Sequence, residues 1–268
     1  MNSDFDEGAD VEERVPDRRE EEARRSLEDF FEANRDRVYF SRQIEVQNED
    51  TWYQWISNRA LRELIGRRVL SVERRPLASG GAINLVWHKG YRYYRRGAKS
   101  VVGLVEAYSD PNIGGALGLH GEAMVLEGFA RGEFVMRGRN TRSYGGQTWG
   151  ETGHDLDFIF ERDGVGYGVE VKNTLRYMDH DELKAKLRMC GALGLKPVFA
   201  VRMLPKSWIK EVVDAGGFAL ILKYQLYPWT HRDLASRVKR EFGLPVDAPR
   251  ALEQGTMDRF LRWHRERV

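Results

Sequence analysis

Apolar residues follow one another almost without interruption in short stretches of the second half of the chain. Residues 158–160 read Phe-Ile-Phe, residues 167–171 read Tyr-Gly-Val-Glu-Val, and residues 197–201 read Pro-Val-Phe-Ala-Val. Runs of this length are typical of strands that helices cover on both faces. Asp163 and Gly164 supply turn residues between the first two runs, which are therefore predicted to form a β-hairpin.

Helical periodicity surrounds these strands. The predicted helices cover residues 116–131, 179–194, 231–241 and 251–266. In the first of them, one face carries the apolar residues Leu119, Ala123, Leu126 and Phe129. With a further strand predicted over 133–137, helices and strands alternate as in an α/β fold. The last two helices are expected to cap the sheet or to form a dimer contact.

The first hundred residues show a different pattern. We predict a helix around 26–34, a strand or tight turn with a short helix over 38–46, a helix that Asp50-Thr51 caps and Gly66 ends, and strands over 69–75 and 82–88. This order is similar to a winged helix-turn-helix in pattern only. Pattern, length and 41% hydrophobic content predict four segments in the 268 residues: an acidic disordered tail over 1–24, a winged-helix-like module over 25–113, an α/β core over 114–228, and C-terminal helices over 229–268.

Charge is distributed unevenly. Residues 1–30 contain 12 acidic and 5 basic residues, so the rest of the chain is basic although the net charge is only +2. A basic body favours a polyanionic partner. The single cysteine, Cys190, excludes an intramolecular disulfide and is expected in the core. No apolar segment reaches membrane-spanning length and no signal peptide is recognisable, so a cytoplasmic protein with no membrane association is expected.

The predicted hairpin carries the chemistry. Glu170 and Lys172 point to the same face of their strand, and Asp157 opens the partner strand. Two carboxylates and an ammonium on one patch would bind a divalent metal and a phosphate together. The Glu-x-Lys spacing alone is weak, since a solvated strand edge with a Glu–Lys pair produces it too.

Glu122 adds a third carboxylate. It lies within the predicted apolar face of the 116–131 helix, where an isolated charge is costly. Two interpretations stay open: Glu122 joins the metal site, or it pairs with an arginine such as Arg137 or Arg139.

The order of these pieces resembles the PD-(D/E)XK nuclease superfamily, in particular its restriction-endonuclease-like and archaeal Holliday junction resolvase-like branch. The resemblance covers residues 115–225 and implies a mixed sheet flanked by helices. It implies catalytic roles for Glu122, Asp157, Glu170 and Lys172. It further implies Mg²⁺, or Mn²⁺, held by Asp157, Glu170 and Glu122.

The chain departs from the family pattern before the hairpin. His154-Asp155-Leu156-Asp157 replaces the Pro-Asp of the family, so two aspartates compete for the metal. We choose Asp157 because the apolar run begins directly after it, and we keep Asp155 and His154 as assisting residues.

Arginines interleaved with tyrosines and glycines suggest DNA contact. The residues are Arg67, Arg68, Arg74, Arg75, Arg92, Arg95, Arg96, Arg139 and Arg142. The last two lie in a loop predicted between Arg137 and Trp149. Lys184, Lys186 and Arg188 of the 179–194 helix are expected to face solvent, with phosphate contact as the alternative. The expected function is a metal-dependent DNA endonuclease, structure-selective or of the restriction or repair type, and a homodimer by analogy. The alternatives are a DNA-binding regulatory protein with an inactive nuclease fold and a nuclease that acts on RNA.

Overall fold

The protein is described by a computed structural model that covers residues 17–267. The described residues divide into two compact units, one formed by 17–113 with 237–244 and the other by 114–236 with 245–267. Most of the predicted acidic tail, residues 1–16, lies outside the described residues. Within the part that is described, no helix has the length and apolar character needed to cross a membrane.

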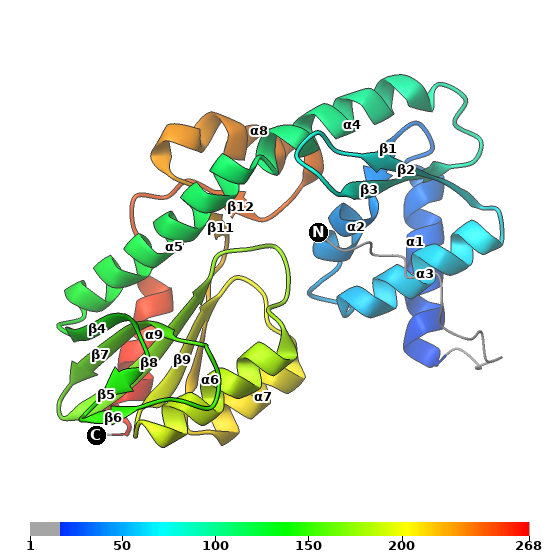
Figure 1. The fold of residues 1–268 in the computed structure, drawn as a ribbon. Helices are drawn as coiled ribbons and strands as arrows, with labels where there is room; N and C mark the ends of the chain where they lie inside the picture. The colour runs from blue at the N-terminus through cyan, green and yellow to red at the C-terminus, as the bar shows by residue number, and fades with distance from the viewer. Residues whose placement is uncertain (1–16, 268) are drawn as a thin grey trace. The chain divides into compact units, whose positions relative to one another are not determined.

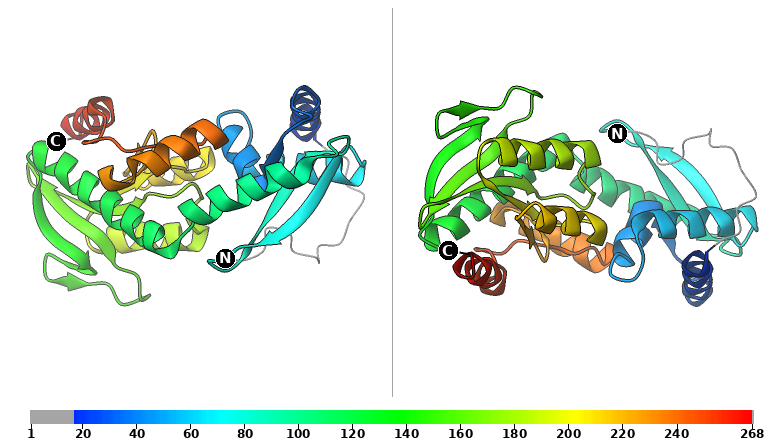
Figure 2. Two further views of the ribbon diagram at one scale, coloured as in Figure 1. Left: turned by 90° about the horizontal axis from the view of Figure 1, so that it is seen from above. Right: turned by 90° about the horizontal axis from the view of Figure 1, so that it is seen from below.

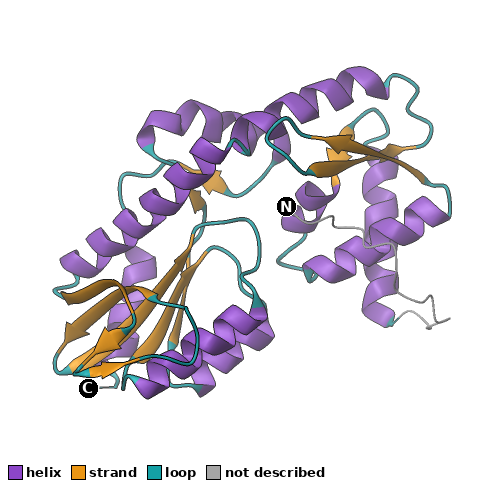
Figure 3. Ribbon diagram, viewed as in Figure 1, coloured by secondary structure: helices purple, strands orange, loops and turns teal. Residues whose placement is uncertain are grey.

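The first unit combines helices with a three-stranded antiparallel sheet of order β1-β3-β2 (Figure 3). Its elements are α1 (Arg18–Ala33), β1 (Val38–Phe40), α2 (Ser41–Gln47), α3 (Gln54–Gly66), β2 (Leu70–Pro76), β3 (Ala82–His88) and α4 (Tyr94–Tyr108). Leu27 and Phe31 of α1 pack with Ile56, Leu61 and Leu64 of α3 in its core. Strands β2 and β3 and the helix that ends at Gly66 form where they were predicted, whereas α4 was missed.

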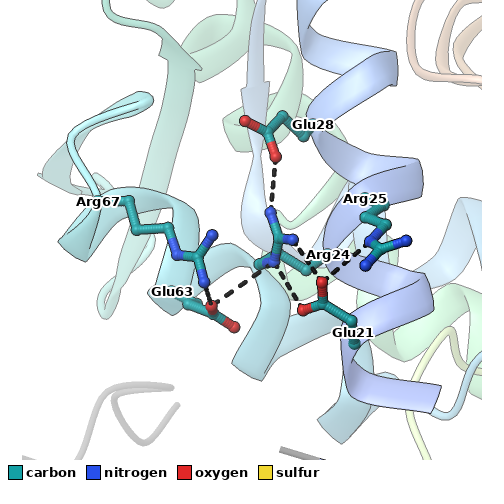
Figure 4. Close-up of polar contacts among 6 residues, drawn as sticks. All are labelled: Glu21, Arg24, Arg25, Glu28, Glu63 and Arg67. Atoms are coloured by element: carbon teal, nitrogen blue, oxygen red, sulfur yellow. Dashed lines mark hydrogen bonds and ion pairs between the residues drawn. The ribbon is translucent and has the colours of Figure 1, made fainter. Parts of the chain in front are cut away.

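Helix α1 corrects the predicted boundary of the disordered tail. It begins at Arg18, and the Asp17 carboxylate caps it by accepting hydrogen bonds from two backbone N–H groups. The polar sequence folds because its charges pair. Buried Arg24 contacts Glu21 and Glu28 on its own helix at 2.7 Å, and Glu63 of α3 at 3.6 Å (Figure 4).

Helix α3 also begins differently from the prediction. Asp50 and Thr51 precede the helix and do not cap it, since its N-cap is Tyr53, which makes no side-chain capping bond. The first helical residue, Gln54, is buried, and its side-chain oxygen accepts a hydrogen bond from Arg42 at 2.6 Å. This contact from α2 fixes the start of α3 in place of a local cap.

The second unit is an α/β structure around a five-stranded mixed sheet of order β10-β9-β8-β7-β4 (Figure 1). Its elements begin with α5 (Pro111–Arg131), β4 (Val135–Thr141), β5 (Ser143–Tyr144), β6 (Gln147–Thr148), β7 (Leu156–Arg162), β8 (Val165–Lys172), α6 (His180–Ala192) and β9 (Lys196–Val201). They continue with α7 (Lys206–Asp214), β10 (Phe218–Ile221), β11 (Gln225–Leu226), a 3₁₀ turn (Trp229–His231), β12 (Val246–Asp247) and α9 (Gln254–Arg265). Helix α8 (Arg232–Phe242) begins in this unit, and its residues from Arg237 onward belong to the first unit. The predicted α/β class is confirmed.

Helices cover both faces of this sheet. Helices α5 and α9 pack on one face, against Phe158, Phe160 and Val169. Helices α6 and α7 lie side by side on the other (Figure 2) and bury Ile159 and Phe199. The uninterrupted apolar runs are strands enclosed on both sides, as predicted.

The β7–β8 hairpin forms as predicted. Phe158 pairs with Val169 and Arg162 with Val165 in antiparallel register. Asp163 and Gly164 make the turn with positive φ angles of 52° and 75°.

The buried face of α5 differs from the predicted one. Leu119 is 65% exposed and Ala123 is exposed, while the buried face is formed by Leu117, Gly121, Met124, Val125, Gly128 and Phe129. Glycines let this face approach its neighbours: a Cβ on Gly121 would lie 2.6 Å from the Cβ of Asn173. The predicted apolar face is rotated from the buried one because the prediction counted apolar side chains and ignored glycine.

The segment predicted as a strand over 133–137 followed by a loop to Trp149 is also different. Glu133 has a φ of 62° and belongs to the turn before β4. Strand β4 continues to Thr141, and the short β5–β6 pair follows it. Buried Trp149 anchors the end of this hairpin.

The C-terminal helix α9 belongs to the α/β core and is no separate segment. Phe260 is fully buried against the sheet. His264 is hydrogen-bonded to the Tyr167 hydroxyl at 2.6 Å and to Asp163 at 2.9 Å, which ties α9 to the hairpin. Capping of the sheet was one of the two predicted roles of this helix.

Replacing Phe260 by Ala should therefore lower the free energy of unfolding by about 3–5 kcal/mol, the usual cost of removing a buried aromatic ring. Chemical denaturation measures this change. Arg262→Ala on the exposed side of α9 is the matched control and should change stability little. Equal effects of the two substitutions would contradict the assigned packing.

Candidate functional site

The candidate site lies where β7 and β8 are paired, on the sheet face that α6 covers. The hairpin register, continued by one residue beyond Phe158 and Val169, sets Asp157 opposite Glu170. Alternation along each strand gives Asp157, Glu170 and Lys172 the same face. The structure therefore brings these three predicted residues together.

Glu170 is the centre of an ion-pair network. Its side chain is almost fully buried, and each of its oxygens receives a lysine. Lys172 Nζ lies 3.0 Å from Oε1, and Lys186 Nζ lies 2.6 Å from Oε2. Lys172 also contacts Glu182 of α6 at 2.9 Å. Burial alone would lower the pKa of Lys172, but Glu170 and Glu182 outweigh it and raise that pKa.

Asp157 is half-buried beside this network. Its Oδ2 accepts a hydrogen bond from the backbone N–H of Val171 at 2.7 Å. Burial, followed by the negative charge of Glu170, raises the pKa of Asp157 to about 7, against the lowering effect of the Val171 N–H and of Lys186. A carboxylate whose ionisation is this costly would gain from a nearby cation.

Lys186 was predicted to face solvent, and this prediction is wrong. The side chain is only 4% exposed, and besides Glu170 it donates to the backbone carbonyl of Asp155. A sequence signal was present. Lys186 lies three residues after Leu183 and four before Cys190, within the buried stripe of α6. Lys186, like Glu122, is therefore recognisable from the sequence as a charge within an apolar helical face.

Glu122 lies at the edge of the site. Its Oε2 accepts from Arg139 of β4 at 3.0 Å, and its side chain is 21% exposed. Its negative charge contributes, as the weakest influence, to the raised pKa of Asp157. The pairing that the sequence left open is therefore present, with Arg139 as the partner, while Arg137 pairs with Glu161.

The two predicted assisting residues do not join the network with their side chains. Asp155 is exposed and contributes only its backbone carbonyl, to Lys186. His154 Nδ1 is hydrogen-bonded to the Thr152 hydroxyl at 2.8 Å. Cys190 is buried as predicted, and burial raises the pKa of its thiol to about 12, so it packs in the core as an uncharged side chain.

The chemistry of the donor set can be tested against a divalent metal. Mg²⁺ is commonly held by one or two carboxylates together with waters and substrate phosphates. Asp157 and Glu170 supply such a pair, and the raised pKa of Asp157 is the mark of carboxylates that a cation would relieve. Within residues 17–267, however, no group of three or more His, Cys, Asp or Glu side chains is arranged to hold a metal. The fit is therefore to a two-carboxylate site, and Glu170 would have to share its oxygens with its lysines.

The predicted nucleic-acid-binding arginines are exposed in both units. Those of the first unit are Arg67, Arg68, Arg74, Arg75, Arg92, Arg95 and Arg96. Arg67 pairs with Glu63 (Figure 4) and Arg75 with Glu73, so these two are partly neutralised. In the second unit Arg142 is exposed next to the β5–β6 hairpin.

Comparisons of the chain with models of known protein families, with characterised proteins and with solved structures found no match. The function of the protein is therefore inferred from the site itself.

The raised pKa of Asp157 has a consequence for stability. Its folded-state pKa of about 7 lies above its ordinary value of 3.8, so the folded chain holds this proton more tightly than the unfolded chain. The contribution of Asp157 to stability is therefore lost as pH rises from about 4 to about 7. Asp157→Asn should raise the free energy of unfolding at pH 8 by on the order of 2 kcal/mol, and this gain should shrink toward pH 4.

Denaturation curves at a series of pH values measure this difference. Asp155→Asn is the matched control because Asp155 is exposed and uses only its backbone carbonyl. An Asp157→Asn protein that is less stable than wild type at pH 8 would contradict the assigned electrostatics.

Proposed function

We propose that this protein is a metal-dependent DNA endonuclease. The observation that carries the proposal is the placement of Asp157 beside Glu170 on paired strands, with the Lys172 ammonium bound to Glu170. The two carboxylates offer oxygen ligands, and the lysine offers a positive charge at the same point. Phosphodiester hydrolysis needs both, because negative charge builds up on the phosphate as the bond breaks.

Each residue has a role in this proposal. Asp157 and Glu170 would hold Mg²⁺ or Mn²⁺ together with the carbonyl of Val171. When bound, the metal supplies polarisation of the phosphate and a more acidic water. The side chain of Lys172 is 31% exposed and can reach a substrate. Its ammonium would orient the water or offset the charge on the phosphate.

The order of elements in the second unit supports the proposal. Helix α5, strands β4, β7 and β8, helix α6 and strand β9 follow each other as in the PD-(D/E)XK nucleases, and the antiparallel strands precede a parallel pair. We therefore extend the proposal to a restriction-endonuclease-like core. Glu122 would assist at the edge of the site once Arg139 turns to a phosphate.

The first unit supports DNA as the substrate. Its order α1-β1-α2-α3-β2-β3 is the order of a winged helix-turn-helix, and its exposed arginines carry positive charge along β2 and the start of α4. We propose that this unit contacts the DNA backbone through these arginines. Homodimer formation remains a prediction by analogy.

One observation favours a second candidate, a DNA-binding protein whose nuclease fold is inactive. Both Glu170 oxygens are already engaged by lysines, and Glu122 is engaged by Arg139. A site that satisfies its own charges can be stable without a metal.

Cleavage assays decide between the two. Purified protein with Mg²⁺ or Mn²⁺ should cut supercoiled, linear, branched or flapped DNA, and Glu170→Gln or Lys172→Met should reduce the rate by about 100-fold or more because each removes transition-state stabilisation. Glu127→Gln, on the exposed side of α5 with its partner Arg131, is the control and should cut like wild type. Absence of cleavage on every substrate would reject the enzyme. Matched DNA and RNA hairpins identify the preferred nucleic acid.

Binding without metal tests the contribution of the first unit. In EDTA the protein should bind DNA with a steep salt dependence, and Arg74→Ala should reduce the slope of log K against log salt by about 1. Fluorescence anisotropy measures this slope. Arg18→Ala on α1, where Arg18 pairs with Glu22, is the control and should leave it unchanged. An Arg74→Ala slope equal to that of wild type would remove Arg74 from the interface.

A further inference from the structure

Lys186 is a buried cation that the proposed chemistry does not use. It lies on α6 with its ammonium against Glu170 Oε2 at 2.6 Å and against the carbonyl of Asp155. Its side chain is 4% exposed, compared with 31% for Lys172 on the other oxygen of the same carboxylate. A lysine is rarely buried this deeply unless its charge is paired.

The two lysines differ in their surroundings. Lys172 divides its charge between Glu170 and Glu182 and reaches solvent. Lys186 is enclosed by α6 and the two strands, and its carboxylate partner is Glu170. With Asp157 opposite Glu170, the pocket would hold two adjacent carboxylates against a single shared ammonium if Lys186 were absent. Lys186 therefore supplies the positive charge that allows these carboxylates to be adjacent before any metal arrives.

We propose that Lys186 is a built-in counter-cation, which holds the Glu170 carboxylate in the metal-free protein and competes with the divalent metal for it. This inference rests on the proposed function, since it assigns a metal to the same carboxylates. Lys186 is a positioning residue in this proposal and does not touch the substrate. Its role is to set the metal concentration at which the site becomes occupied.

The physical reason is that two cations on one carboxylate repel each other. In the low-dielectric interior this repulsion is screened less than at the surface, so an ammonium bound to Oε2 weakens a metal that approaches Glu170. Removal of the Lys186 ammonium frees Oε2 of Glu170 for the metal. The metal-free protein then loses stability, because Glu170 keeps only the shared Lys172.

The experiment compares thermal unfolding of the full-length wild type and Lys186→Met over a series of MgCl₂ and MnCl₂ concentrations. Met keeps an unbranched side chain, shorter by one atom, and removes its charge. Without metal, the variant should unfold at a lower temperature than wild type. The metal concentration needed for a given rise in the unfolding temperature, here called the metal requirement, should be lower than for wild type by about tenfold or more. Lys184→Met, exposed on the same helix, is the control and should behave like wild type.

Unchanged or weaker metal binding in Lys186→Met would overturn the proposal, because it would make Lys186 neutral or helpful toward the metal. If the variant does not fold without metal, MnCl₂ should restore its circular dichroism spectrum, and failure to restore it would also overturn the proposal. Glu170→Gln combined with Lys186→Met removes both charges. This double variant should recover stability in the absence of metal and lose the response to metal.

These results separate the inference from the proposed function. If wild type cuts DNA and Lys186→Met has the same metal requirement as wild type, the counter-cation role is rejected and the nuclease proposal stands. Wild type and Lys186→Met that both show no metal response and no cleavage would reject the nuclease, and the counter-cation with it. A lower metal requirement in Lys186→Met supports the counter-cation role, whether or not a substrate that the protein cleaves has been found.

Discussion

The buried carboxylate of Glu170 is the constraint on which the rest of the site depends. A charge at the centre of an α/β sheet is costly unless it is paired, and here two lysines from different elements pair with it. Lys172 comes from the same strand and Lys186 from the covering helix, so the packing of α6 on β8 and the electrostatics of the site are a single arrangement. Asp157 is held against the same group by the hairpin register.

Under the proposed function, the site would have two tasks. The fold would have to be stable without metal, and the same carboxylates would have to be available when a metal arrives. The buried Lys186 on one oxygen of Glu170 would serve the first task, and the partly exposed Lys172 on the other oxygen would be available for the second. Burial, followed by the charge of Glu170, raises the pKa of Asp157, so the site disfavours a further negative charge even with its lysines in place.

Much of the fold followed from the sequence because its signals are local. The apolar runs and the Asp163-Gly164 turn predicted the β7–β8 hairpin, and with it the meeting of Asp157, Glu170 and Lys172. Features that depend on tertiary contacts were predicted less well. The polar residues at the start of α1 read as disorder because the partner of Arg24 on α3 cannot be seen in its own helix.

Glu122 of α5 and Lys186 of α6 show most clearly where prediction from the sequence was limited. The apolar face assigned around Glu122 was shifted because the packed side of α5 uses Gly121 and Gly128, which hydrophobicity overlooks. Lys186 was assigned to solvent although its spacing from Leu183 and Cys190 put it in the buried stripe of α6. That prediction followed the residue type, because lysines are usually exposed. For a buried charge, the position within the helical stripe is more informative than the residue type.

The proposals for this protein all require that Asp157 and Glu170 form a site for a divalent metal. Calorimetric titration of MnCl₂ at pH 7, in buffers of different ionisation enthalpy, tests this requirement. Metal binding should release a proton, so the observed heat should change with the buffer in wild type and cease to do so in Asp157→Asn. Absence of metal binding, or a heat that is the same in every buffer, would contradict it.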